Sequence, residues 1–191
     1  MGAALCSGTE AVVSGSFHMK GVPTAVVAEI FCDVESWPVV HPYVISVEFI
    51  RGHPGQVGSC WMERRRFRNQ EILMRKNVVR RSEDEGFFST GHALEVLEGG
   101  GWGVQKSFAT YTITIRDESD GCTVCWNDAF LSTGVCGKIF LALLLPCLRR
   151  SFTAHVLEEW QAFYEEALRR TVEEARGEET PQVAQKSSAN D

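Results

Sequence analysis

The chain has 191 residues, of which 44% are hydrophobic and 23% charged, and its formal net charge is -6. This length suits one domain and is enough to bury a core without disulfides or metals. An acidic chain is a poor candidate for nucleic-acid binding, because phosphates require clustered cations.

Seven cysteines are spread along the chain, several of them in apolar runs. An odd number of thiols in such settings indicates buried free cysteines in a reducing compartment. No basic segment followed by an apolar stretch opens the sequence, and the apolar run 139–148 is about half the length that crosses a bilayer. We therefore expect a cytoplasmic protein. Residues 1–7 resemble a myristoylation signal with Cys6 in place of Ser or Thr, and an unmodified end is favoured.

The first expected element is a strand over 11–20, where Val and Phe alternate with polar residues. Residues 21–23 interrupt that pattern, and residues 24–32 have the apolar spacing of a helix. Two prolines and Trp37 in residues 33–43 predict a short helix and a turn.

Six strand-like stretches follow, separated by short turns. They cover residues 44–51, 57–67, 71–81, 86–95, 104–116 and 122–131. Strands joined by such short turns are antiparallel neighbours. Together with the first strand they predict a sheet of about seven strands.

The last ordered element is a helix over 150–175, which contains no Gly or Pro and carries a broad apolar stripe. Pro146 lies just before it, so residues 138–145 are expected to form a separate helical segment. The polar residues 177–191 are expected to be a disordered tail and residues 1–9 a flexible leader, which leaves one domain over 10–176.

A turn at 117–121 sets the register of the last two strands, placing Tyr111 near Asp128 and Ile113 near Trp126. One face of this pair is then apolar except for Tyr111 and Asp128. A carboxylate on such a face finds a partner or has a raised pKa. Together the two side chains could orient a ligand hydroxyl or carbonyl; alternatively Asp128 is solvated, or bonds a backbone amide.

Other candidate residues are isolated in the sequence. Trp61 and Glu63 share one strand face, while His41, His92 and His155 each stand alone and are more often structural or surface residues. Cys122 and Cys125 are three apart on a strand, so they point to opposite faces and do not suggest a metal or redox pair. We expect no metal and no cofactor.

Basic residues gather on two adjacent expected strands, while the final helix and tail are acidic. The basic set is Arg64, Arg65, Arg66, Arg68, Arg75, Lys76, Arg80 and Arg81. A solvated face is favoured, and the alternative is a patch that transiently contacts an anionic membrane.

The order of elements resembles the START-related, polyketide-cyclase-like (SRPBCC) superfamily. The supporting motifs are the helix Val22 to Phe31, Trp37-Pro38, Pro42-Tyr43-Val44, Gly55 to Gly58, Asp120 to Val124 and the apolar run Gly137 to Leu148. The resemblance covers about residues 10–175. It implies an α+β helix-grip fold, in which a curved antiparallel sheet wraps around the long C-terminal helix. Superfamily members bind lipids, hormones, polyketides and other apolar molecules; a minority catalyse, and no catalytic set is shared.

The expected function is therefore binding or transport of an apolar small molecule, such as a lipid or polyketide, in a cavity between the sheet and the C-terminal helix. The expected ligand contacts are Trp61, Tyr111, Ile113, Trp126, Asp128, Phe130, Trp160 and Phe163. Two alternatives stay open: a cyclase or aromatase that uses Asp128, Tyr111 or a histidine as acid or base, and a protein-interaction module whose cavity is filled. The absence of a clustered acid–base set in the sequence favours the carrier over the enzyme.

Overall fold

The computed structural model describes residues 9–67, 70–99, 108–132 and 135–178. The elements in chain order are β1 (Thr9–Lys20), α1 (Thr24–Cys32), α2 (Trp37–Val40), β2 (Val44–Arg51), β3 (Cys60–Phe67), β4 (Gln70–Asp84), β5 (Phe87–Glu98), β6 (Phe108–Glu118), β7 (Gly121–Ser132) and α3 (Val135–Glu178). The expected leader and tail lie outside the described residues, except that Thr9 belongs to β1 and residues 177–178 belong to α3.

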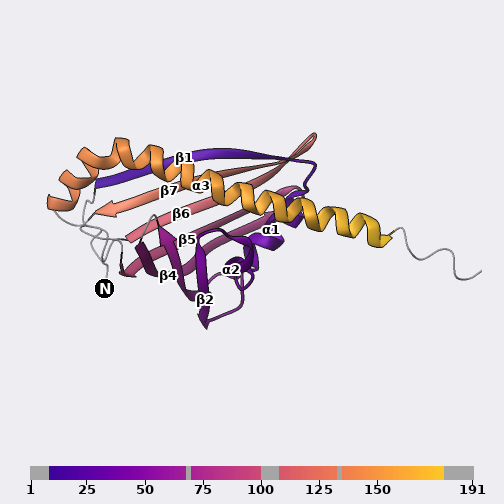
Figure 1. Ribbon diagram of the computed structural model, residues 1–191, viewed down its shortest axis with the longest axis horizontal. Helices are drawn as coiled ribbons and strands as arrows, with labels where there is room; N and C mark the ends of the chain where they lie inside the picture. Colours follow the sequence, from indigo (N-terminus) through magenta and orange to yellow (C-terminus); the bar gives the residue numbers. More distant parts are fainter. Residues whose placement is uncertain (1–8, 68–69, 100–107, 133–134, 179–191) are drawn as a thin grey trace, which may run out of the picture.

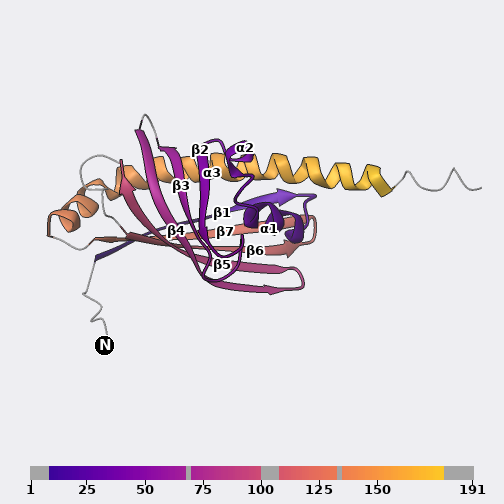
Figure 2. The ribbon, with the colours of Figure 1, turned by 90° about the horizontal axis from the view of Figure 1, so that it is seen from below.

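The seven strands form one antiparallel sheet in the order β1-β7-β6-β5-β4-β3-β2. Successive strands from β2 to β7 pair with one another, while β1 returns to pair with β7 from Thr9↔Ser132 to Lys20↔Gly121. Figures 1 and 2 show α3 lying across one face of this curved sheet, with α1 and α2 beside it. This arrangement confirms the expected helix-grip fold.

The final helix differs from the expectation in one respect. Residues 138–145 do not form a separate segment, because α3 runs from Val135 to Glu178 as one helix of 44 residues. Pro146 lacks the N–H of a helical hydrogen bond, and an interior proline kinks a helix when surrounding packing keeps both halves helical. Figures 1 and 2 show the corresponding bend in the first, orange part of α3.

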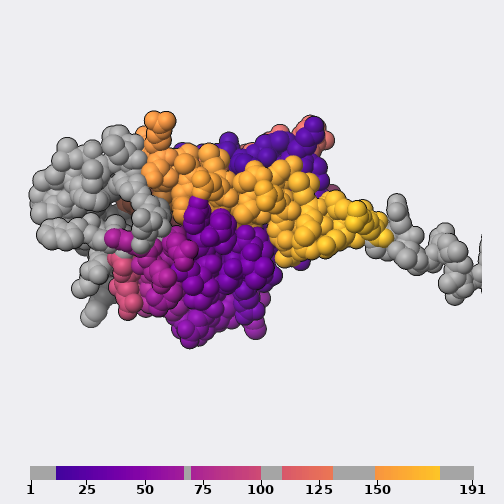
Figure 3. Space-filling model, viewed as in Figure 1, coloured from indigo at the N-terminus to yellow at the C-terminus, as the bar shows by residue number. Residues whose placement is uncertain are grey.

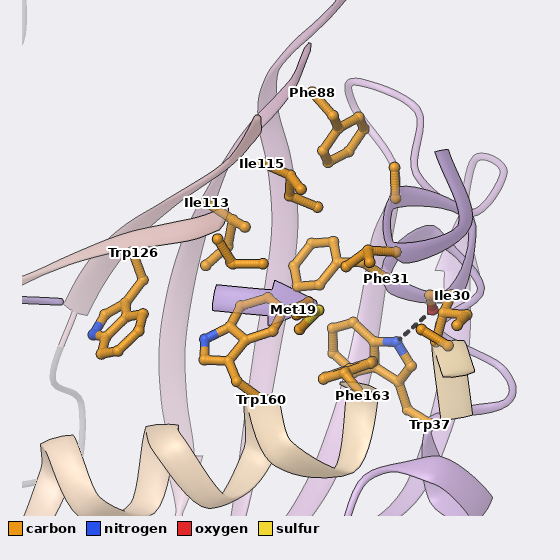
Figure 4. Close-up of a cluster of buried hydrophobic side chains, with 14 of the residues drawn as sticks. Met19, Ile30, Phe31, Trp37, Phe88, Ile113, Ile115, Trp126, Trp160 and Phe163 are labelled. Carbon is orange, nitrogen blue, oxygen red and sulfur yellow. Dashed lines mark hydrogen bonds between the residues drawn. The ribbon is translucent and has the colours of Figure 1, made fainter. Parts of the chain in front are cut away.

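The main core fills the space between the sheet, α1 and α3. α1 contributes Val27, Ile30 and Phe31, which are almost fully buried, and α3 contributes Trp160 and Phe163 (Figure 4). Figure 3 shows the described part of α3, in orange and yellow, lying directly against indigo-to-purple residues from the N-terminal part of the chain. Side chains therefore fill the space between the sheet and α3 at the place where α1 contacts α3.

A glycine on β1 sets how closely the sheet approaches one tryptophan. A Cβ added at Gly15 would lie 2.3 Å from Cζ2 of Trp126, which is nearer than any non-bonded carbons approach. The edge of the indole therefore packs directly on the β1 backbone, and Gly15 is required for that contact.

Two findings bear on the thiols and on membranes. Cys32, Cys60, Cys122 and Cys125 are free in the structure, and Cys60 and Cys122 are buried. Among the described helices, none has a stretch that is both long and apolar enough to span a bilayer.

Candidate functional site

The face of β6 and β7 that lies under α3 has the register expected from the turn. Tyr111 is opposite Asp128, and Ile113 is opposite Trp126. Phe130 continues the same face two residues beyond Asp128, and its ring packs edge-on against Phe152 of α3 at 5.3 Å between centroids. α3 therefore covers this face as the sequence predicted.

One half of the enclosed space is filled by aromatic rings. Trp160 and Phe163 of α3 lie 5.9 and 6.1 Å from the ring of Phe31, and Phe163 also contacts Trp37. Trp61 is fully buried and packs against Trp37 at 6.2 Å. Figure 4 shows this cluster closed around Phe31, while Trp126 lies at its edge with the indole nitrogen turned away.

The other half contains a buried group of charged side chains, which we call the ionic cluster: Glu63, Arg65, Lys76 and Glu159. Nζ of Lys76 lies 2.7 Å from Glu63 Oε2, and an Arg65 amino group lies 3.7 Å from Glu63 Oε1. Arg65 also donates to Glu159 of α3. Glu63 is fully buried and Lys76 is 4% exposed, so the cluster belongs to the interior.

Two histidines extend the ionic cluster toward α2 and α3. His41 Nε2 lies 3.3 Å and His155 Nε2 3.2 Å from a carboxylate oxygen of Glu159. The ring of His155 stacks on Tyr43 at 3.7 Å between centroids. Of the three partners of Glu159, His41 directly follows α2 and Arg65 belongs to β3, so they fasten the middle of α3 to both elements.

Burial and charge act against each other in the ionic cluster. Burial disfavours the carboxylate of Glu63, but the charges of Lys76 and Arg65 hold its pKa below the usual value. Burial likewise opposes the charge of Glu159, and Arg65 and His41 hold its pKa well below normal. Burial lowers the pKa of Lys76, and Glu63 opposes that change. Both carboxylates are therefore ionised at neutral pH and each has a basic neighbour.

Tyr111 and Asp128 stand beside this cluster and are not part of its ion pairs. Burial, and then the charge of Glu159, raises the pKa of Asp128 to about 7. Burial, followed by the charges of Glu63 and Asp128, raises the pKa of Tyr111 well above its usual value. The Tyr111 hydroxyl has no hydrogen-bond partner among the described residues. These two groups can donate hydrogen bonds near neutral pH.

His92 forms the floor beneath Tyr111. Its ring stacks on the phenol at 4.4 Å between centroids with an interplanar angle of 4°, and its Nε2 shares a hydrogen bond with the Thr90 hydroxyl. Burial, together with the charge of Lys76, lowers the pKa of His92 to about 3. A neutral imidazole therefore fixes the plane of the Tyr111 ring.

The expected basic patch is corrected by the structure. Period-two alternation turns Arg65 and Lys76 inward, while the side chains of Arg64 and Arg75 remain 42 and 48% exposed. Those two exposed arginines pair with Glu71 and Glu95. The surface is therefore less basic than the sequence suggested, and two of its expected cations belong to the candidate site.

Sequence reasoning missed Lys76, Arg65 and Glu159 as site residues. One signal was available for Lys76, which occupies an inward position in the alternating run Ile72, Met74, Val78 on β4. No such signal existed for Glu159, because its proximity to β3 depends on where α3 crosses the sheet.

The expected ligand contacts fall into two groups. Trp61, Ile113, Trp160 and Phe163 lie in the packed aromatic half, each at most 5% exposed. Tyr111, Trp126, Asp128 and Phe130 lie on the face of β6 and β7 that continues toward Phe152. Contact of either group with a ligand remains a prediction.

Two spaces are found beside the described residues, one of them small and the other superficial. A void of about 10 Å³ lies beside Phe31, Trp61 and His92, close to the least volume that a water molecule requires. A groove of about 490 Å³ lies on the outside between α1, Pro54 and Arg81. Within the described residues, no group of three His, Cys, Asp or Glu side chains is placed to hold a metal ion.

Comparisons with solved structures identify the fold. The chain is similar to major latex-like protein 151 of Panax ginseng, with 13% identity and a TM-score of 0.63 over 84% of this chain and 99% of that one. It is also similar to norcoclaurine synthase of Thalictrum flavum, with 13% identity and a TM-score of 0.59 over 87 and 99% of the two chains. The ZhuI aromatase/cyclase from Streptomyces sp. R1128 matches with 13% identity and a TM-score of 0.57 over 85 and 96%.

Sequence comparisons add nothing to this, because no family model and no curated protein matches the chain. At identities this low, the structural likeness establishes the fold alone. The chain therefore shares the helix-grip fold of these structures, as its element order suggested.

Proposed function

We propose that this helix-grip chain binds an apolar small molecule between α3 and the inner face of β6 and β7. The observation that carries the proposal is a pair of buried hydrogen-bond donors, the Tyr111 hydroxyl and Trp126 Nε1, which have no partner among the described residues. Buried donors in proteins are nearly always paired, so donors without a protein partner on an apolar face favour a ligand or an ordered water there.

The apolar surroundings of these donors support the same proposal. Phe130 and Phe152 adjoin Asp128 along the sheet, and Trp126 lies at the edge of the aromatic cluster with its nitrogen turned away from it (Figure 4). A mostly apolar lining with a few polar groups is typical of small-molecule sites.

Native mass spectrometry of freshly purified protein tests the proposal. We expect a non-covalent small-molecule adduct that is lost on denaturation, and binding of naphthalene once that adduct is removed. Phe130→Asp should abolish both, because it places a carboxylate on the proposed site. Asn127→Asp adds the same charge on the outer face of β7 and serves as the control. A protein without an adduct that also binds no naphthalene contradicts the proposal.

A second candidate function is a cyclase or aromatase. The argument against it from the sequence, that no acid–base set is clustered, is weakened, because Asp128 with a pKa of about 7 lies opposite Tyr111 and is influenced by Glu159 and Lys76. A carboxyl group that titrates near neutral pH is suited to general acid–base catalysis. Incubation of the adduct with the protein distinguishes the candidates. If the protein is an enzyme, the adduct should lose water with the native protein but not with Asp128→Asn. If the protein is a carrier, the mass of the adduct should stay unchanged.

A further inference from the structure

Three polar side chains share one face of two neighbouring strands. Tyr111 of β6 is opposite Asp128 of β7, and Trp126 lies two residues before Asp128 on the same face. The tyrosine hydroxyl and the indole N–H are both donors and neither has a partner in the described part of the chain. Both are satisfied only by an acceptor atom, and oxygen is the acceptor that they commonly bind.

The charges around this face are already balanced. Lys76 pairs with Glu63 at 2.7 Å and Arg65 pairs with Glu159, which makes two cations for two carboxylates. Asp128 is influenced by Glu159 from α3, Lys76 from β4 and Arg65 from β3, and it lies opposite Tyr111 of β6. An added ionic group would find no counterion that is free of an existing pair.

Because these charges are already paired, the site should favour some ligand head groups over others. A carboxylate or phosphate would lie near three carboxyl groups, Glu63, Glu159 and Asp128, whose neighbouring cations are already engaged. An ammonium group has no acceptor, so it would leave the Tyr111 and Trp126 donors unpaired. An uncharged oxygen satisfies the donors and adds no charge.

Resting on the function proposed above, we infer that the ligand is an apolar molecule with an uncharged hydroxyl or carbonyl group, whose oxygen accepts a hydrogen bond from Tyr111 beside Asp128. Its apolar body would extend along the same face toward Phe130 and Phe152. The ionic cluster would not bind the ligand directly and would instead exclude charged analogues.

A series of probes with one apolar body tests this inference. Naphthalene measures binding to the apolar part, while 2-naphthol, 2-acetylnaphthalene, 2-naphthoate and 2-naphthylmethylammonium add one head group each. We expect the alcohol and the ketone to bind about tenfold more tightly than naphthalene, which corresponds to ~1.4 kcal/mol. The carboxylate and the ammonium should bind more weakly than naphthalene.

Two tyrosine variants test whether the Tyr111 hydroxyl causes the tighter binding of the uncharged, oxygen-containing probes. Tyr111→Phe should bring the affinity of 2-naphthol close to that of naphthalene while leaving naphthalene binding unchanged. Tyr164→Phe removes the same atom on α3, where the hydroxyl donates to the backbone oxygen of Lys20, and should leave the preference intact.

The pH dependence of the ketone adds an independent readout, because 2-acetylnaphthalene does not titrate. A protonated Asp128 stabilises a nearby oxygen acceptor, and this group has a pKa of about 7. The affinity of the ketone should therefore fall as the pH rises through 7, and Asp128→Asn should remove the slope.

The outcomes separate this inference from the function on which it rests. Equal affinity for all head groups, or strongest binding of the carboxylate or the ammonium, overturns the inference and leaves the proposed function standing. If none of the five probes binds, the proposed function fails and the inference fails with it.

Discussion

Lys76 and Glu63 form an ion pair of 2.7 Å in a part of the sheet where both side chains are at most 5% exposed. A buried pair of this kind contributes little net stability compared with apolar residues, but removal of one partner leaves an uncompensated charge in the interior. The pair therefore makes both residues individually indispensable to the folded state.

We expect Lys76→Met to lower the free energy of unfolding by ~3–5 kcal/mol, as measured by urea denaturation. Arg75→Met is the matched control, since the neighbouring Arg75 makes an exposed ion pair with Glu95, for which a loss below ~1 kcal/mol is expected. The double variant Lys76→Met/Glu63→Gln should lose less than the sum of its single changes. Additive losses would show that the two side chains are not coupled.

Asp128 provides a prediction about pH. Its folded pKa of about 7 lies above the ordinary value of 3.8 for an aspartate, so between these pH values the folded state binds more protons than the unfolded state. Stability therefore falls as the pH rises across that range. Asp128→Asn removes the titrating group and should gain stability relative to the wild type between pH 5 and pH 8, by an amount on the order of 2–4 kcal/mol. Parallel stability curves for the two proteins would contradict the raised pKa.

Residue patterns predicted the strand register but not the ionic cluster. The turn at 117–121 fixes Tyr111 opposite Asp128, because period-two alternation leaves one choice once a turn is set. The approach of Arg65 to Glu159 depends on the angle at which α3 crosses β3, which local patterns do not encode. His41 and His155, isolated in the sequence, meet at Glu159 for the same reason.

At the scale of elements, α3 is held against α1 and the sheet by aromatic packing along one stripe. Phe163 is 3% exposed and lies within 6.1 Å of the rings of Phe31, Trp37 and Trp160. Several of these contacts are edge-to-face or tilted, the arrangements that aromatic pairs favour. The stripe thus determines which face of the helix meets the core.

Phe163→Ala should lower the free energy of unfolding by ~3–5 kcal/mol, because it leaves a cavity that the neighbouring rings cannot fill. Leu157→Ala is the control on the same helix, since Leu157 is 37% exposed and should lose well under half as much. Thermal and urea denaturation followed by circular dichroism measure both. Similar losses for the two variants would mean that α3 is not docked through this stripe.

The sequence predicted the element boundaries well where prolines and turn residues mark them clearly. The limits of α1 and β2 agree with the pattern, because Pro23, the prolines near 40 and the turn at 53–55 leave little freedom. Pro146 was misleading, since an interior proline can kink a helix without ending it, and α3 continues through this position.

At the scale of the whole molecule, the function depends on how much of the space between the sheet and α3 is filled by side chains. The aromatic half around Phe31 is packed, with a void of about 10 Å³ next to Trp61, so the described residues leave no room for a ligand there. Trp61 Nε1 also lacks a hydrogen-bond partner there, whereas the Tyr111 hydroxyl and Trp126 Nε1 are unpaired donors on the face of β6 and β7 that continues to Phe130. A fully packed grip would suit a protein-interaction module, whereas the proposed ligand requires space on this face of β6 and β7.

Ile113→Trp separates these possibilities because Ile113 belongs to the packed aromatic half, is 5% exposed and lies opposite Trp126. We expect the larger side chain to overpack the core and to lower the free energy of unfolding by ~1–3 kcal/mol. Naphthalene binding should persist within about threefold, because the proposed site lies beyond Trp126 and the overpacking does not occupy it. Thr110→Trp adds the same ring at an exposed position on β6 and should change neither quantity. A variant that keeps full stability and loses binding would place an open cavity at Ile113 instead. A destabilised variant of a wild type that binds no apolar probe would identify a filled module and end the carrier proposal.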